Sequence, residues 1–161
     1  MELSKKHHWL ALFVLIFATF GLSAFGTLAV TSSLSVWYPS LAKPSWNPPS
    51  AVFGPVWTVL YLMMAVAAWL VWRRGSEAEV VPAMTAYFGQ LVLNILWSLI
   101  FFGLKAPGWA VFDIVVLWVA IIVAIAQFGK VSRIAAWLLV PYLAWVTFAS
   151  LLNITIWRMN G

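Results

Sequence analysis

Polar and aromatic side chains recur at helical spacing inside otherwise apolar stretches, and these are the residues that could bind a ligand. Residues three, four and seven positions apart share one face of a helix. Four such faces occur: Trp57, Tyr61, Met64 and Ala68; Gln90, Asn94, Trp97 and Phe101; Trp109, Asp113 and Val116; and Tyr142, Trp145, Ala149 and Leu152. Aromatic walls with a few hydrogen-bonding groups typify sites for apolar ligands. The spacing therefore predicts a pocket where these faces converge.

Each of these side chains also has a structural interpretation. Asn94 and Asn153 are equally consistent with hydrogen bonds between helices, worth about 0.6 kcal/mol each on average in membrane bundles. Asp113 is the only formally charged residue within the apolar stretches, and pairing with Lys105 or capping a helix end explains it as well as a role in transport does. Ligand contact and core packing are equally consistent with three of the indoles: Trp57, Trp97 and Trp145.

Conventional catalytic chemistry has no motif in this sequence. There is no P-loop, G-x-G-x-x-G, H-E-x-x-H or G-x-S-x-G pattern. The chain has no cysteine, which excludes a disulfide, a thiol nucleophile and a cysteine-ligated metal. His7 and His8 are adjacent and diverge by about 100° on a helix, so they make a poor metal site. We therefore expect no metal site and no required cofactor.

The elements that position these residues are membrane-spanning helices. The chain is 65% hydrophobic and 8% charged, whereas soluble domains carry roughly 25% charged residues. Five stretches lack Lys and Arg and exceed the roughly 20 residues that a helix needs to cross a bilayer. Backbone polar groups in lipid must be satisfied internally, which favours helices. We predict an all-α integral membrane protein, a five-transmembrane-helix bundle forming a single domain over residues 1–161, with helices at about 9–30, 51–72, 82–104, 106–128 and 134–157.

Two prolines and one long connection qualify this prediction. Pro82 suits the first turn of the third helix, and Pro141 should kink or loosen the fifth. Residues 31–50 form a long structured loop between the first two helices, and loops beyond about 12–15 residues are often functional. The first apolar stretch also resembles a signal peptide, but it is longer than the usual 7–15 residues and lacks an Ala-x-Ala site, so a retained helix is expected.

The distribution of basic residues predicts the orientation. Six lie at the N-terminus and in the second and fourth loops: Lys5, Lys6, Arg73, Arg74, Lys130 and Arg133. Three lie at the other side: Lys43, Lys105 and Arg158. The excess places the N-terminus in the cytoplasm and the C-terminus outside. The net charge of +5 is thereby attributed to topology and lipid headgroups, and nucleic acid is not expected as a partner.

Four motifs in order resemble the tryptophan-rich sensory protein family (TspO/MBR), whose mitochondrial members are called translocator protein or peripheral benzodiazepine receptor. They are WYPSLAKPSWNPP (37–49), FGPVWTVLY (53–61), GQLVLNILWSLIFFG (89–103) and PYLAWVTFASLLNITIWRMN (141–160). The similarity runs in register from about Trp37 to Asn160. It implies a five-helix bundle, commonly a homodimer, and Ala120-x-x-x-Ala124 is a small-residue candidate for the dimer contact.

The resemblance also implies ligands and the residues that hold them. The expected ligands are porphyrins such as protoporphyrin IX and haem, sterols in many members, and synthetic isoquinoline-carboxamide and benzodiazepine compounds. Between Leu152 and Arg158 the Tyr of the animal cholesterol pattern is missing, which argues against tight cholesterol binding and favours a bacterial member that binds tetrapyrroles. The positions carried over are Trp46, Asn47, Pro48, Trp57, Tyr61, Asn94, Trp97, Trp109, Asp113, Trp145, Phe148, Ala149 and Leu152.

Three functions follow as hypotheses. The first is a membrane receptor or transporter-like protein that binds porphyrins and acts in tetrapyrrole homeostasis or stress signalling, with Lys43 or loop amides meeting the carboxylates. The second is a light- and oxygen-dependent porphyrin-degrading enzyme that uses Trp57 and Trp145. The third is a structural or regulatory membrane protein. Under the first two, the proline-stiffened segment at residues 43–49 is interpreted as a lid that lays Trp46 and Asn47 over the pocket.

Overall fold

The computed structural model describes residues 5–161, and the side chains in that range apart from those of residues 5–7, 29 and 30. Its elements are helices and the turns between them: α1 (Lys5–Ser32), α2 (Tyr38–Ser40), α3 (Ser50–Arg74), α4 (Glu77–Ser98), α5 (Pro107–Val131) and α6 (Arg133–Asn160), with π-helical segments at Ser33–Trp37 and Leu99–Gly103. Within residues 5–161, five helices have the length and apolar composition to cross a membrane. The predicted all-α five-helix membrane bundle is confirmed.

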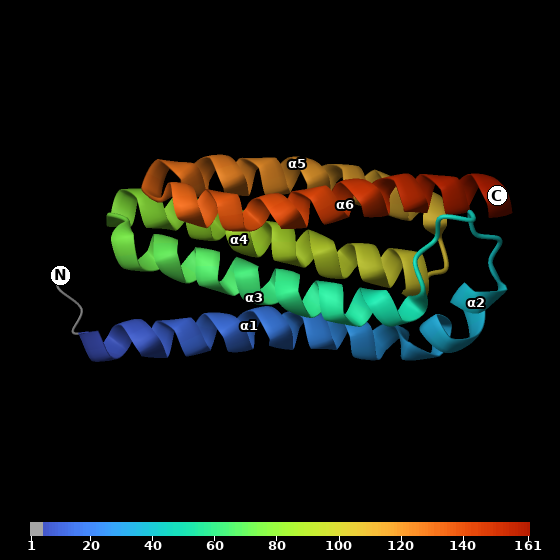
Figure 1. The fold of residues 1–161 in the computed structure, drawn as a ribbon, viewed down its shortest axis with the longest axis horizontal. Coiled ribbons are helices and arrows are strands. Elements are labelled where there is room, and N and C mark those ends of the chain that lie inside the picture. The colour runs from blue at the N-terminus through green and yellow to red at the C-terminus, as the bar shows by residue number, and fades with distance from the viewer. Residues whose placement is uncertain (1–4) are drawn as a thin grey trace.

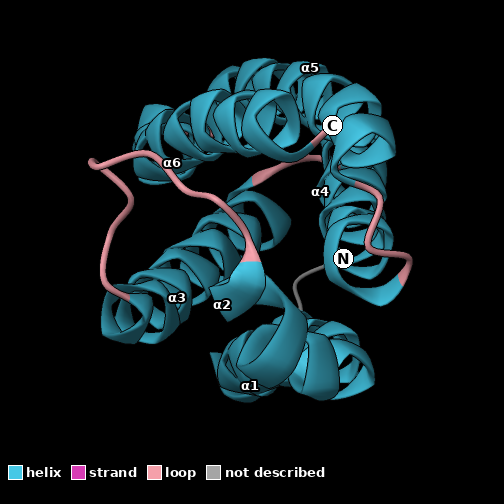
Figure 2. Ribbon diagram, turned by 90° about the vertical axis from the view of Figure 1, so that its right-hand side faces the viewer, coloured by secondary structure: helices cyan, strands magenta, loops and turns pink. Residues whose placement is uncertain are grey.

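The five long helices form a closed ring when the bundle is seen from its end (Figure 2). The order around the ring is α1, α3, α6, α5, α4, and each neighbouring pair is in contact. The short α2 and the C-terminus of the chain lie at one end of the bundle, and the N-terminal end of α1 lies at the other (Figure 1). Because α3 and α6 are neighbours, the second and fifth predicted spans face each other along their length.

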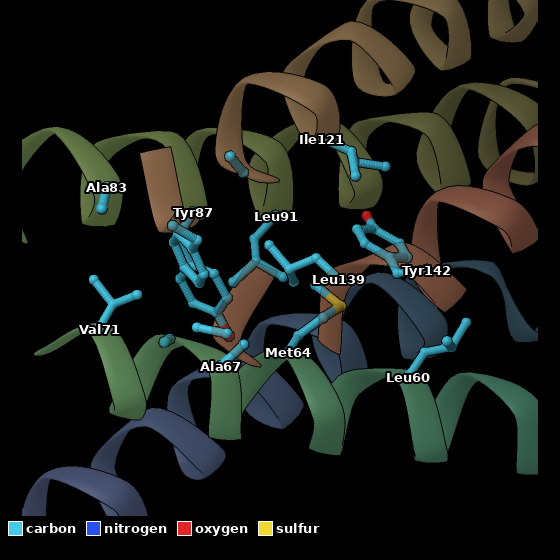
Figure 3. Close-up of a cluster of buried hydrophobic side chains, with 14 of the residues drawn as sticks. Leu60, Met64, Ala67, Val71, Ala83, Tyr87, Leu91, Ile121, Leu139 and Tyr142 are labelled. Carbon is cyan, nitrogen blue, oxygen red and sulfur yellow. The ribbon is translucent and has the colours of Figure 1, made fainter. Parts of the chain in front are cut away.

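The apolar core runs along the inside of this ring (Figure 3). Large side chains such as Met64, Tyr87 and Leu139 are fully buried. Alanines at Ala67 and Ala83 have no exposed surface, and such small residues let membrane helices approach closely. Large apolar side chains also cover the outside, where Phe17 is 76% exposed. Apolar surface of this kind is stable only against lipid, in agreement with the composition.

Two details differ from the sequence-based prediction. α4 begins at Glu77 because Ser76 and Glu79 form a capping box, in which the Ser76 N–H donates to Glu79 Oε2 at 3.0 Å. Pro82 therefore lies in the second turn of α4, and its predicted place in the first turn is wrong.

The predicted dimer contact is the second detail. Ala124 is 1% exposed and packs inside the bundle, so it does not offer a surface to a second copy. α6 continues through Pro141 as one helix.

The connection between the first two spans is more ordered than a loop over residues 31–50. α1 extends to Ser32, a π-helical segment and α2 follow, and the irregular part is confined to 41–49. π-helical turns are rare and often lie at functional sites. In Figure 2 this irregular segment leaves α2, crosses the end of α6 and returns to α3. We call residues 41–49 the first loop.

Candidate ligand-binding site

Aromatic rings from α3, α6 and the first loop meet beneath that loop. Trp57 and Trp145 touch edge to face, with ring centroids 6.4 Å apart and planes at 90°. Phe53 packs on Trp145 at 5.9 Å, and Trp46 of the first loop packs on Phe148 at 5.8 Å. Perpendicular and offset ring contacts at these distances are the favourable arrangements for aromatic pairs. Together with Tyr61, which stacks on Trp57 at 5.3 Å, these residues are called the aromatic site.

Helical spacing explains why these rings converge. On α3, Phe53, Trp57 and Tyr61 lie four residues apart and therefore share one face. On α6, Trp145 and Phe148 are three residues apart and also share a face. α3 and α6 are neighbours in the ring, so the two faces oppose each other. The convergence predicted for the second and fifth spans is thus observed for Trp57, Tyr61 and Trp145.

A chain of polar side chains closes the inner side of the aromatic site. The Tyr61 hydroxyl donates to Asn94 Oδ1 at 2.9 Å, and Asn94 Nδ2 donates to the Tyr142 hydroxyl at 3.2 Å. The Tyr142 hydroxyl in turn donates to Gln90 Oε1 at 2.7 Å. We call these four residues the amide–tyrosine chain. It joins α3, α4 and α6 through buried and partly buried hydrogen bonds, so the helix-bridging interpretation of Asn94 is confirmed.

Replacing Asn94 with Ala is expected to destabilise the bundle by about 2 kcal/mol, because the Tyr61 hydroxyl loses its acceptor and the Tyr142 hydroxyl loses one of its two partners. Thermal unfolding in detergent, followed by circular dichroism, measures this loss. The matched control is Val92→Ala on the same helix, since Val92 is 58% exposed and faces lipid. Equal stability of the Asn94 and Val92 variants would contradict the structural role of the chain.

Three buried polar atoms have no hydrogen-bond partner within the described residues: Gln90 Nε2, Asp113 Oδ2 and Trp145 Nε1. An unsatisfied buried donor or acceptor costs about 1–3 kcal/mol, so such atoms are uncommon and call for an explanation. Trp145 Nε1 belongs to the aromatic site. Asp113 is 5% exposed and forms no ion pair with Lys105 or any other described residue. The predicted alternative that Lys105 neutralises it is therefore wrong.

Other predicted site residues lie in a second cluster that borders the aromatic site. Trp97 stacks on Phe101 at 5.3 Å and donates through Nε1 to Asn153 Oδ1 at 2.9 Å. Leu152 is buried beside the same Phe101, with Phe148 packed against the cluster. Ala149 packs against the main core. Trp97 and Asn153 thus bridge α4 and α6, as the core-packing interpretation predicted.

Trp109 lies away from the aromatic site. It is 74% exposed and lines a surface hollow of about 600 Å³ together with Phe112 and Trp157. The buried face of α5 contains Ala110 and Asp113, and Trp109 is about 100° around the helix from Ala110. The predicted convergence of Trp109 with the other faces is therefore not observed.

The Lys43 side chain forms its hydrogen bonds with the first loop and α2. Its ammonium group donates to the carbonyl oxygens of Tyr38, Pro39 and Leu41 at 2.8, 3.2 and 2.7 Å. An ammonium has three donors, and all three are used. The same group lies 5.1 Å from the centre of the Tyr38 ring. The expectation that Lys43 meets the carboxylates of a ligand is not supported by this arrangement.

The remaining predicted loop residues also stabilise the loop itself. The Tyr38 hydroxyl donates to Asn47 Oδ1 at 3.1 Å, and Asn47 Nδ2 donates to the Pro48 carbonyl at 3.1 Å. Burial raises the pKa of the Tyr38 hydroxyl above its ordinary value of 10.0, so it stays protonated and able to donate at neutral pH. Of the three predicted loop residues, Trp46 is the one whose ring contacts the aromatic site.

Two contributors were not identified from the sequence. Phe53 belongs to the site and could have been found, because it precedes Trp57 by one helical turn. Phe20 of α1 packs on Tyr61 with ring centroids 6.0 Å apart. No signal marks Phe20, since it lies in an apolar run outside the four motifs. Its contact follows from the ring order of the helices, which places α1 beside α3.

The fold and site define an integral, multi-pass membrane protein of five spanning helices, with an aromatic site formed by α3, α6 and the first loop. The TspO/MBR family model matches residues 11–158, and the chain belongs to this family. It is 44% identical over 136 residues to the tryptophan-rich protein TspO of Chlorobaculum tepidum, covering 84% of this chain and 86% of the relative. It is 44% identical over 126 residues to the human translocator protein, covering 77% and 75%. It is 38% identical over 148 residues to the tryptophan-rich sensory protein of Cereibacter sphaeroides, covering 90% and 91%.

Proposed function

We propose that this protein binds porphyrins, such as protoporphyrin IX and haem, in the aromatic site and acts in tetrapyrrole homeostasis or stress signalling. The observation that carries the proposal is the buried N–H of Trp145, which has no partner within the described residues although the indole is surrounded by rings of Phe53, Trp57 and Phe148. A planar macrocycle with large apolar faces and polar groups matches this combination.

Binding requires the rings to separate. Trp57 and Trp145 are in contact, so an entering macrocycle exchanges ring–ring contacts for ring–macrocycle contacts. The first loop covers this place through Trp46, and the loop acts as the lid. Since Lys43 is engaged by three carbonyl oxygens, the propionates are left to two exposed residues, Lys105 just before α5 and Arg158 in the last turn of α6. The start of α5 lies beside this part of α6, where Asn153 Nδ2 donates to the Pro107 carbonyl. We assign this end of the bundle to the outside and the N-terminus to the cytoplasm.

Titration of the purified protein with protoporphyrin IX in darkness tests the proposal. We expect saturable quenching of tryptophan fluorescence together with a shift of the Soret band. Because the chain has 12 Trp residues, Trp137→Phe serves as the control: Trp137 is 70% exposed and lies outside the site, so its loss should leave the affinity unchanged. Linear, non-saturable quenching at all concentrations would exclude porphyrin binding in a defined site.

A second candidate function rests on the contact between Trp57 and Trp145. In this function the excited porphyrin gives one electron to dioxygen, which forms superoxide and a porphyrin radical cation; the two combine at a ring carbon, so that dioxygen is added to the pigment and the macrocycle opens. The two indoles in contact would hold the pigment and exchange an electron with its radical cation. Illumination of the complex under oxygen should then bleach the pigment faster than in a matched detergent control. Equal bleaching rates would leave binding as the function and remove degradation.

A further inference from the structure

The side chain of Asn160, in the last turn of α6, pairs with the backbone of the first loop. The Ala42 N–H donates to Asn160 Oδ1 at 2.9 Å, and Asn160 Nδ2 donates to the Ala42 carbonyl at 2.9 Å. The second N–H of the amide donates to the Ile156 carbonyl of α6 at 2.8 Å. The side-chain amide of Asn160 thus offers Ala42 one donor and one acceptor, as the backbone of a paired β-strand would. A third hydrogen bond, to the Ile156 carbonyl, fixes this amide to α6.

Apart from the Pro49 carbonyl, which accepts from the Val52 N–H where the chain enters α3, the Ala42–Asn160 pair is the hydrogen-bonded connection between the first loop and the long helices within the described residues. Among the described residues, the other hydrogen bonds of residues 38–48 stay within the loop and α2 or reach the adjoining π-helical segment, at Ser33 and Trp37; they include those of Lys43 and Asn47. Ring contacts supply the rest of the attachment, with Tyr38 on Phe102 at 5.6 Å on one side and Trp46 on Phe148 at 5.8 Å on the other. Ala42 lies between these two contacts.

We propose that Asn160 is a positioning residue for the ligand: it latches the first loop so that Trp46 covers the aromatic site, and its release opens the route by which a ligand leaves. This inference rests on the proposed porphyrin binding for its ligand and on the Ala42–Asn160 pair for its mechanism. Both residues are exposed, so opening exchanges protein hydrogen bonds for water hydrogen bonds at small net cost. The three prolines and Lys43 keep the released loop stiff, and it moves as a unit.

Four variants separate the latch from general effects on α6. Asn160→Ala removes both hydrogen bonds to Ala42. Asn160→Asp keeps an acceptor for the Ala42 N–H but sets a carboxylate oxygen against the Ala42 carbonyl, while Asn160→Gln retains both donor and acceptor on a longer side chain. Met159→Ala is the control, since Met159 is in the same turn and 47% exposed but makes no hydrogen bond to the loop through its side chain.

The first measurement needs no ligand. Hydrogen–deuterium exchange of the intact protein in detergent should show faster exchange in the peptide covering residues 41–49 for the Ala and Asp variants. Exchange in that peptide should stay at the wild-type rate for Met159→Ala and return toward it for Asn160→Gln. Exchange in the core of α6 should not change. Unchanged loop exchange in both the Ala and Asp variants would overturn the latch, whatever the protein binds.

The second measurement uses protoporphyrin IX. Its dissociation, followed after addition of excess competing vesicles, should be about tenfold faster in Asn160→Ala, a change appropriate to the loss of two exposed hydrogen bonds. Association should also quicken, so the affinity should change less than the dissociation rate. If hydrogen exchange of residues 41–49 were faster in Asn160→Ala but protoporphyrin IX left at the wild-type rate, the loop would not control release of the ligand. Absence of saturable binding to the wild type would contradict the proposed function, while the exchange experiment still decides the latch.

Discussion

Replacement of Trp145 with Ala should weaken protoporphyrin IX binding by about a hundredfold, because large aromatic anchors at the centre of a site commonly contribute more than 2 kcal/mol. The indole contacts Phe53, Trp57 and Phe148, so its removal takes away a wall of the site. It also removes the buried N–H that has no partner within the described residues. Dark titration measures the change, with thermal unfolding as a check on folding.

Trp145→Phe separates the two contributions. The phenyl ring keeps an aromatic wall but lacks the N–H, so we expect a loss of about tenfold, which corresponds to one hydrogen bond to a ligand acceptor. Trp109→Ala distinguishes the aromatic site from the hollow between α5 and α6, where Trp109 lies. If Trp109→Ala abolished binding while Trp145→Ala bound as the wild type does, the porphyrin would be bound in that hollow.

Replacement of Lys43 with Met should speed ligand dissociation by about tenfold or more, because it removes three hydrogen bonds from a charged donor that together hold the loop in shape. Methionine keeps the length of the side chain but cannot donate. Stopped-flow dissociation of protoporphyrin IX measures this effect, and hydrogen exchange of residues 41–49 reports on the loop. Lys43→Arg should retain part of the effect, since a guanidinium can still donate to carbonyl oxygens.

The dimethyl ester of protoporphyrin IX decides how Lys43 acts. Its propionates carry no charge, so a lysine that binds carboxylates would matter only for the free acid. The structure places the ammonium on the carbonyls of Tyr38, Pro39 and Leu41, and we therefore expect the same acceleration with both ligands. An effect of Lys43→Met on the acid alone would show that the lysine leaves the loop to bind the ligand.

The fold could be predicted because one physical requirement dominates it. Apolar stretches without Lys or Arg must cross the bilayer as helices, and the structure shows five helices that fit this requirement. The helix ends were harder to predict, because hydropathy marks where a helix leaves lipid rather than where it stops. The capping box formed by Ser76 and Glu79 sets the start of α4. It marks the first turn of the helix five residues before Pro82, so Pro82 is a poorer indicator of this start.

The site was predictable where periodicity and helix adjacency agree. Trp57, Tyr61 and Trp145 share faces that oppose each other, and the family resemblance names the same residues. Trp109 shows the limit of this reasoning. It lies only about 40° from Asp113 around α5, yet Asp113 is buried and Trp109 is exposed, because the edge of the buried face falls between them. The attachment of Asn160 to Ala42 joins residues 118 positions apart, and no local pattern in the sequence encodes it.

The amide–tyrosine chain has a consequence for biosynthesis. Ribosomes deliver helices from the N-terminus onward, so α4 enters the membrane before α6. Until α6 follows, Gln90 and Asn94 lack Tyr142, and polar groups in lipid without partners are costly. We therefore expect newly inserted α4 to stay near the insertion machinery or beside α3, where the Tyr61 hydroxyl already donates to Asn94 Oδ1. Arrival of the last helix completes the chain of hydrogen bonds and the aromatic site at the same moment.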